Sequence, residues 1–293
     1  MAVFSNKVTH RQLAGLAFAV LLWSTTAHAQ GTPNVVTVGA NLTAGQRQQM
    51  LKDFGATQTA RVLTINHQDE ERLLSGVAPQ SQIGTRSISS SAVTLEGSGY
   101  GIHVTTRDIT WVTPAMYANA LATAGVKNAR VMADAPYPVS GTAALAGILT
   151  AYQTASGSNI PLSQQRTAAQ EMMVTGNLGD QIGSKSKAAM LVMRVKNTVI
   201  QNHLTSSSSI RPVVVNEANR LNITLTNTQM TNITNLMLSL SRLPLNAQTL
   251  TSQLQGWEQK AASAVPPGLW QQLSQWLSQI WRAIQSLLHG GKP

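Results

Sequence analysis

The 293-residue sequence contains no cysteine, and only 11% of its residues are charged. Without cysteine there are no disulfides or thiolate metal sites, so stability must come from packing and hydrogen bonds. Charged residues make up about a quarter of an average globular protein, and here Gln, Asn, Ser and Thr supply the surface polarity instead. Hydrophobic residues reach 43%, which is enough for a buried core.

Long apolar runs are also missing after the N-terminal segment. A spanning helix needs roughly 20 apolar residues, so we expect no transmembrane segment once the leader is removed. The leader itself has the three parts of a secretory signal peptide: basic Lys7 and Arg11, an apolar run over residues 13–23, and a closing Ala-His-Ala. We predict cleavage after Ala29 and a secreted, extracellular protein, with attachment to the cell wall left open.

The formal net charge of +10 is unevenly distributed. Residues 30–160 hold eight basic and seven acidic residues, whereas residues 161–293 hold eleven basic and four acidic ones. Outside the membrane such a field favours anionic partners such as wall polymers, phospholipid headgroups or acidic glycans, and we predict an anionic cell-wall polymer or an envelope protein as the partner. We expect no nucleic acid partner for an exported chain. A generally basic, soluble surface without one ligand is the alternative.

Strand and helix signals alternate through the first half of the chain. Thr43 with Gln46 three positions on forms a capping box, and Thr113 precedes a proline that suits a first helical turn, so helices are predicted after both threonines. The runs 86–95 and 101–106 are rich in β-branched residues, and the glycines of EGSGYG between them predict a hairpin. Further strands are predicted at residues 35–38, 60–66 and 129–133.

Beyond residue 161 the apolar spacing is helical, and Thr226 with Gln229 forms another capping box. The fold class is therefore predicted as α+β, or mixed α/β. It has an N-terminal mixed sheet with helices, followed by an all-helical C-terminal region ending in an amphipathic Trp-rich helix. The predicted segments are a signal peptide (1–29), an α/β domain (30–160), a helical region (161–265) and a C-terminal amphipathic helix with its tail (266–293).

The C-terminal helix is the most regular segment of the sequence. Its apolar residues, among them Trp270, Trp276 and Trp281, fall within an arc of about 140° on a helical wheel. This stripe needs a cover, which is the protein's own core, a second copy of the chain, a partner groove or the membrane interface. The polar face is mostly Gln and Ser with one Arg282, which is unlike the basic face of membrane-surface helices.

Several strings together resemble the YpuA-like family of exported Gram-positive proteins, a domain of unknown function. The matching strings are VVTVGANLTAGQRQQMLKDFG, IGTRSISS, the run from Ile109 through MYANALATAGV, and APYPVSGTAALAGILTAY. The resemblance covers roughly residues 34–200 and, more weakly, the helices beyond. The resemblance implies an extracellular or wall-associated location and a Gram-positive source. It implies no activity, cofactor or catalytic residue.

The best candidate site is the loop PYPVSGT, residues 136–142, before a predicted helix. Ser140, Gly141 and Thr142 are the candidate anion-binding residues, because Gly141 allows close backbone approach and a helix start attracts anions. Ser140 is also conceivable as a nucleophile. The simpler interpretation is that Ser140 or Thr142 caps the helix and that the small residues let it pack tightly on the sheet.

Other chemistry finds little support in the sequence. His67 and His103 are the only histidines of the exported chain before its helical half, and nothing local places either beside Ser140. The histidines show no metal-ligand spacing, and no Walker loop, dinucleotide fingerprint or zinc motif is present. We therefore expect no metal and no cofactor, and the catalytic residues stay unknown.

The leading hypothesis is a non-catalytic cell-envelope protein that binds an anionic wall component or an envelope partner. One alternative is an envelope hydrolase that acts on peptidoglycan or a related polymer, using Ser140 or a carboxylate of the first half. Another is an oligomeric module that self-associates through the C-terminal helix.

Overall fold

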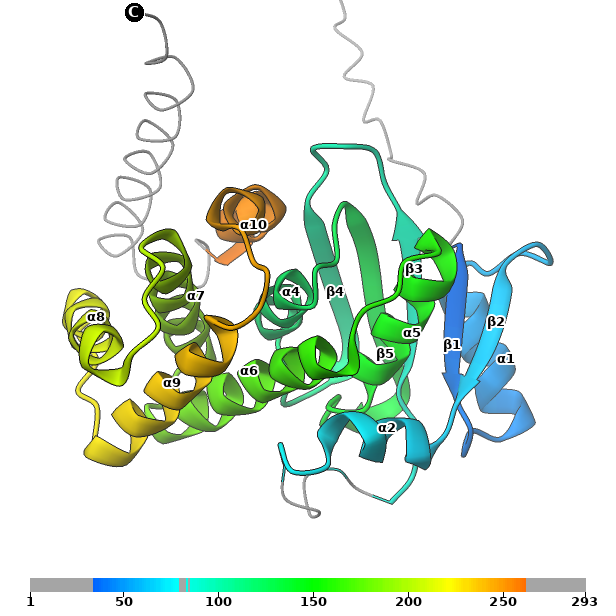
Figure 1. Cartoon of the computed structure of the whole chain (residues 1–293). Helices are drawn as coiled ribbons and strands as arrows, with labels where there is room; N and C mark the ends of the chain where they lie inside the picture. Colours follow the sequence, from blue (N-terminus) through cyan, green and yellow to red (C-terminus); the bar gives the residue numbers. More distant parts are fainter. Residues whose placement is uncertain (1–33, 79–82, 84, 262–293) are drawn as a thin grey trace, which may run out of the picture. The chain divides into compact units, whose positions relative to one another are not determined.

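A computed structural model describes residues 34–78, 83 and 85–261 of the chain. The predicted signal peptide and the predicted Trp-rich helix, with Trp270, Trp276 and Trp281, lie outside these residues. The described part holds a five-stranded sheet followed by a succession of helices (Figure 1). The α+β fold class is confirmed.

The strands and helices alternate up to residue 156, and only helices follow. The strands are β1 Val35–Gly39, β2 Arg61–Ile65, β3 Ser90–Leu95, β4 Ile102–Ile109 and β5 Ala129–Val139. The helices of the alternating part are α1 Ala44–Asp53, α2 His67–Leu74, α4 Pro114–Thr123 and α5 Ala144–Ser156. The later helices are α6 Leu162–Gln181, α7 Lys185–Gln201, α8 Ser207–Arg220, α9 Asn227–Leu240 and α10 Ala247–Ala261.

The predicted helix starts are confirmed in detail. Thr43 accepts a hydrogen bond from the Gln46 backbone, and the Gln46 side chain accepts one from the Thr43 backbone, so α1 begins with a complete capping box. The box of Thr226 and Gln229 opens α9 in the same way. Thr113 caps α4. Each box satisfies backbone N–H groups that have no partner within the helix.

The sheet order is β2-β1-β3-β5-β4, with β3 antiparallel to both of its neighbours. The predicted hairpin of β3 and β4 is therefore wrong, because β5 lies between them. The connecting loop bridges the start of β5. Glu96 N donates to the backbone oxygen of Asn128, and Gly101 N donates to its side chain. The glycines still allow the chain to turn, but the loop crosses the start of β5 instead of joining two neighbouring strands.

Strand β5 is longer than predicted, since residues 136–139 of the predicted loop belong to it. Both prolines of this segment lie beyond Asp134, the last residue that pairs with β3, and the pairing with β4 resumes only at Val139. A proline lacks the backbone N–H that a paired strand needs, so it is tolerated where a neighbour is missing. The sequence therefore did not indicate a strand here, because prolines are tolerated only at an irregular strand end.

The two faces of the sheet are covered by different helices. On one face, Met50 of α1 and Phe54, the residue that follows this helix, pack against Val36 and Val38 of β1. On the other face lies α5, whose Gly147 lets the helix approach the buried hydroxyl pair of Thr37 and Ser91 closely. A methyl group at Gly147 would lie only 2.6 Å from the Thr37 hydroxyl oxygen. The expectation that small residues let this helix pack tightly on the sheet is confirmed.

Helix α4 joins the sheet to the later helices. It contacts β4, α6 and α7 (Figure 1), and its residues from Met116 to Thr123 are all buried. At its end is a buried polar cluster, in which the Lys196 ammonium donates to Glu171 at 2.7 Å and to Thr123 and the Asn119 backbone at 3.0 Å. The lysine thus uses its three donors inside the core.

Several cations of the basic second half are also occupied internally. Lys196 and Arg194 are 0% and 2% exposed, and each forms an ion pair with a buried glutamate, Glu171 and Glu217 respectively. Lys185 pairs with Asp180 across the turn between α6 and α7. These three cations serve packing, so a surface site for anions must be sought elsewhere.

Candidate functional site

The C-terminal ends of β1, β2, β4 and β5 meet at one edge of the sheet, because these four strands are mutually parallel. Open sheets of this kind commonly bind ligands outside the carboxyl ends of their strands. Two cavities open at this edge in the described part of the chain. One lies beside the start of α5, and the other lies on the face covered by α1.

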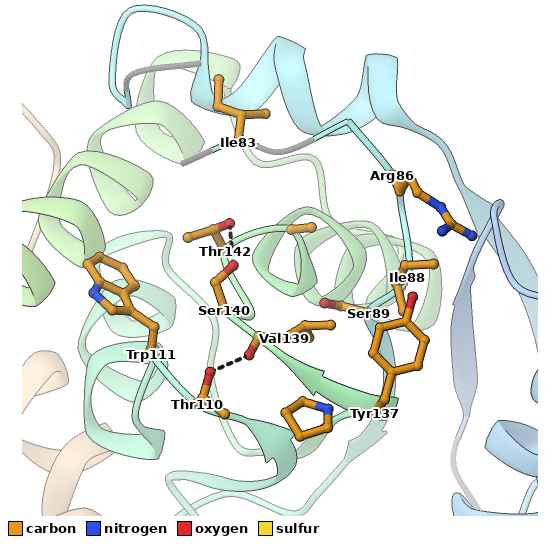
Figure 2. Close-up of a pocket in the computed structure, with 12 residues that line it drawn as sticks. Ile83, Arg86, Ile88, Ser89, Thr110, Trp111, Tyr137, Val139, Ser140 and Thr142 are labelled. Atoms are coloured by element: carbon orange, nitrogen blue, oxygen red, sulfur yellow. Dashed lines mark hydrogen bonds between the residues drawn. The ribbon is translucent and has the colours of Figure 1, made fainter. Parts of the chain in front are cut away.

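The cavity beside α5 has a volume of about 570 Å³, and we call it the Ser140 cavity. Its walls come from the segment before β3, the residues after β4, and the end of β5 with the start of α5. Figure 2 shows Trp111 and Tyr137 on opposite sides, with the hydroxyls of Ser89, Ser140 and Thr142 between them. The lining residues are Ile83, Arg86, Ile88, Ser89, Thr110, Trp111, Tyr137, Pro138, Val139, Ser140, Thr142 and Ala143.

Two of the three predicted anion-binding residues, Ser140 and Thr142, line this cavity, whereas Gly141 between them is buried and does not. Gly141 adopts a φ of +90°, and its carbonyl oxygen accepts a hydrogen bond from the buried Tyr117 hydroxyl. The exposed Ser140 and the buried Thr142 place their hydroxyl oxygens 3.4 Å apart (Figure 2). The expectation that Ser140 or Thr142 caps the helix is wrong, since the N-cap residue of α5 is Ala143 and no side chain caps it. Neither hydroxyl caps α5.

Trp111 forms a fixed wall of the cavity. Its indole lies against Gly176 of α6, where any larger side chain would collide with the ring. Its Nε1 donates to Asp180 at 2.7 Å, and the Lys185 ammonium lies 4.1 Å from the ring centroid, which is a cation–π distance. Contacts on three sides hold this aromatic surface without help from a ligand.

Asp180 should give this wall a pH dependence. Desolvation alone would raise the pKa of Asp180, but hydrogen bonds from Lys185 and Trp111 and the lysine charge outweigh it and lower the pKa from its ordinary 3.8. A lowered carboxyl pKa stabilises the fold above 3.8 and ceases to do so as the pH falls through the folded-state value. Because the carboxylate is 53% exposed, the contribution is at most about 1 kcal/mol.

We therefore expect Asp180→Asn to lower the free energy of unfolding by up to about 1 kcal/mol at pH 7. The difference from the wild type should shrink as the pH falls below 3.8, because protonation then removes the same charge in the wild type. Urea unfolding at pH 7, 5 and 3 measures this. A difference that stays constant down to pH 3 would contradict the assignment.

Arg86 is the one charged residue among the described residues that line the cavity, and Figure 2 draws its guanidinium pointing away from the hydroxyls of Ser140 and Thr142. Its side chain is exposed at the rim, on the same side as Tyr137 (Figure 2), and it forms no ion pair with any described residue. Tyr137 is 40% exposed, an unusual position for a large aromatic side chain. Arg86, which has no ion pair among the described residues, and the exposed ring of Tyr137 thus both line the cavity.

A general base for Ser140 is missing from the cavity. None of its described lining residues is His, Asp, Glu or Lys. The His103 ring forms a hydrogen bond with the backbone oxygen of Tyr100 at the start of β4, at the opposite edge of the sheet. His67, at the start of α2, contacts Glu71. Activation of a serine hydroxyl requires such a base within hydrogen-bond reach.

The second cavity, about 500 Å³, is organised by Arg107. The Arg107 guanidinium bridges Asp53 of α1 and the fully buried Asp134 of β5. Burial raises the pKa of Asp134 although hydrogen bonds from Arg107 and Ala135 oppose the shift. Asp108, at a φ of +53°, forms the β-bulge next to this arginine. Both oxygens of Asp134 are occupied by this network, which fastens α1 to the sheet.

The described residues show neither a metal site nor a membrane-spanning helix. They contain no group of three or more His, Asp or Glu side chains arranged to hold a metal ion. Among residues 34–78, 83 and 85–261, no helix combines the length and the apolar character required to cross a bilayer.

Sequence analysis missed Arg86, Ser89, Trp111 and Tyr137 as members of the cavity. Arg86 and Ser89 precede a strand, and Trp111 follows another, so only the strand order brings them to the start of α5. Tyr137 lies in the predicted loop 136–142, and its aromatic ring between two prolines is the one local feature that could have indicated its position at the cavity.

Comparisons with known proteins agree with the resemblance found in the sequence. A family model described as "Protein of unknown function (DUF1002)" matches residues 38–257. The chain is 33% identical over 258 residues to "Uncharacterized protein YpuA" of Bacillus subtilis (strain 168), covering 86% of this chain and 89% of that protein. No solved structure matches the chain. The suspected YpuA-like relationship is confirmed, and the chain belongs to the DUF1002 family of proteins of unknown function.

Proposed function

We propose that the protein is an exported, non-catalytic protein of the cell envelope that binds an anionic wall component in the Ser140 cavity. The observation that carries the proposal is the position of Arg86, an exposed cation without an ion pair among the described residues, at the rim of a hydroxyl-lined cavity. Guanidinium groups bind carboxylates and phosphates through paired N–H donors.

The start of α5 adds to this preference. Helix α5 is 13 residues long, its N-cap residue Ala143 lines the cavity, and no side chain caps it. The N-terminus of a helix carries a partial positive charge that favours anions. Arg86 and the helix start therefore act in the same direction on a negatively charged ligand.

Two sequence features support the location. The leader has the composition of a cleaved secretory signal, and the exported form would carry a net charge of +8, because Lys7 and Arg11 leave with the leader and take the total of +10 down by two. Anionic polymers of the wall are the abundant partners that such a protein would meet.

Sedimentation with purified Gram-positive walls tests the proposal. The exported form, expected to begin at Gln30, is incubated with walls before and after removal of their anionic polymers, at low and at physiological salt. We expect it to sediment with intact walls, to stay in solution with stripped walls, and to bind less at high salt, since screening weakens exposed charge contacts. Equal sedimentation with both wall preparations, or with neither, would contradict the proposal.

A further inference from the structure

The Ser140 cavity offers more than a place for an ion. Its lining combines the exposed ring of Tyr137, the hydroxyls of Ser89 and Ser140, and the exposed Arg86 at the rim, whose guanidinium must turn toward the cavity to meet a ligand. Figure 2 places the ring and Arg86 on one side and the hydroxyls toward the middle. A volume of about 570 Å³ is far larger than a bare inorganic anion needs and lies within the usual range for small-molecule sites.

The three kinds of group fit different parts of one ligand. A sugar ring has an apolar C–H face that packs on an aromatic ring, and hydroxyls that exchange hydrogen bonds with serine and threonine. A carboxylate or phosphate group on that sugar matches the paired donors of an arginine. A purely apolar ligand would leave the hydroxyls unused, and a bare ion would leave Tyr137 unused.

The rigidity of the site supports a ligand with a fixed shape. Trp111 is held by Gly176, Asp180 and Lys185, and the turn at Gly141 is held by Tyr117. A preformed cavity loses little conformational entropy on binding, so even a small ligand can bind with measurable affinity. The exposed side chain of Arg86 is the part that can adjust to the position of the acid group.

We infer that the Ser140 cavity binds an acidic sugar unit, with the sugar ring against Tyr137 and its carboxylate or phosphate at Arg86. This inference rests on the proposed function, because it takes the anion site as given and names the ligand that carries the charge.

Isothermal titration calorimetry of the exported form with four probes tests the inference. The probes are glucuronate, glucose 6-phosphate, glucose as the neutral match, and inorganic phosphate as the bare anion. We expect at least one acidic sugar to bind about tenfold tighter than both glucose and phosphate, because a charge-assisted hydrogen-bond pair adds to the ring contact. Glucuronate and glucose 6-phosphate also tell which acid group is preferred.

Three substitutions separate the two contacts. Arg86→Gln should weaken the acidic sugar about tenfold and leave glucose unchanged. Tyr137→Ala should weaken both sugars, whereas Tyr137→Phe, which keeps the ring, should retain the affinity within about twofold. Arg61→Gln, which removes an exposed charge from β2 outside the cavity, is the control and should change nothing. Circular dichroism confirms that each variant is folded.

The outcomes distinguish the two proposals. Phosphate that binds as tightly as both acidic sugars, with no effect of Tyr137→Ala, would overturn the sugar inference while the anion site stands. Absence of binding for both acidic sugars would also overturn it, whatever the walls do. Failure of the protein to bind intact walls as well would remove the proposed function itself.

Discussion

Lys196→Met is expected to lower the free energy of unfolding by about 3–5 kcal/mol, the usual range for breaking a buried ion pair. Lys196 and Glu171 are both 0% exposed, and the ammonium lies 2.7 Å from the carboxylate. Removing the lysine leaves the glutamate charge buried with Thr123 as its remaining donor. A buried carboxylate without a countercharge is among the most costly defects in a protein core.

Chemical unfolding of two matched variants checks this expectation. Arg72→Met breaks the ion pair with Asp69. Because the Arg72 side chain is 64% exposed, the free energy of unfolding should fall by at most about 1 kcal/mol. The double variant Lys196→Met with Glu171→Leu removes both charges and should recover much of the loss. A Lys196→Met variant as stable as Arg72→Met, or a double variant no better than the single one, would show that the pair is not a close buried contact.

Gly141→Ala is expected to lower the free energy of unfolding by about 2–5 kcal/mol. The glycine has a φ of +90°, where an L-residue costs about 1–2 kcal/mol. A methyl group there would also collide with the Ile109 side chain and approach the Tyr117 hydroxyl oxygen to 2.7 Å. Overpacking of this kind usually costs a further 1–3 kcal/mol or so.

Gly157 at the other end of α5 provides a matched control. It has a φ of +69° but open space around the position of a methyl group. Gly157→Ala should therefore cost only the conformational part, about 1–2 kcal/mol. Urea unfolding of both variants separates strain from collision, and equal losses would contradict the tight turn at Gly141. Only Gly141→Ala should also weaken ligand binding, because it displaces Ser140 and Thr142.

The local structure of this chain is predictable where short-range chemistry decides it. The capping boxes at Thr43 and Thr226 predict where α1 and α9 begin, because their hydrogen bonds join residues three positions apart in the sequence. The strand at 35–38 is evident from its β-branched residues. The α+β class followed from the same patterns.

The order of the strands was not predictable in this way. The run EGSGYG favours a tight turn on local grounds, yet β5 pairs with both β3 and β4 and separates them. The pairing depends on the buried faces of three strands and on Asn128, which holds both ends of the loop. Such contacts join residues about 30 positions apart, and no window of sequence contains them.

The candidate site likewise combines residues that the local sequence indicates with residues that only the strand order brings there. Ser140, Gly141 and Thr142 are predicted because a glycine before a helix has a local meaning, and Ser140 and Thr142 line the cavity. Arg86 and Trp111 reach the cavity only through the positions of β3 and β4. The strand within PYPV was missed because its prolines indicate a loop wherever pairing on both sides is assumed.

The most direct test of the account is wall binding by Arg86→Gln compared with Arg61→Gln. Both substitutions remove one exposed positive charge, but only Arg86 lies at the Ser140 cavity. The account predicts that Arg86→Gln weakens binding to intact walls about tenfold and that Arg61→Gln stays within about twofold of the wild type. Equal losses in the two variants would show that net charge, and not the cavity, binds the wall.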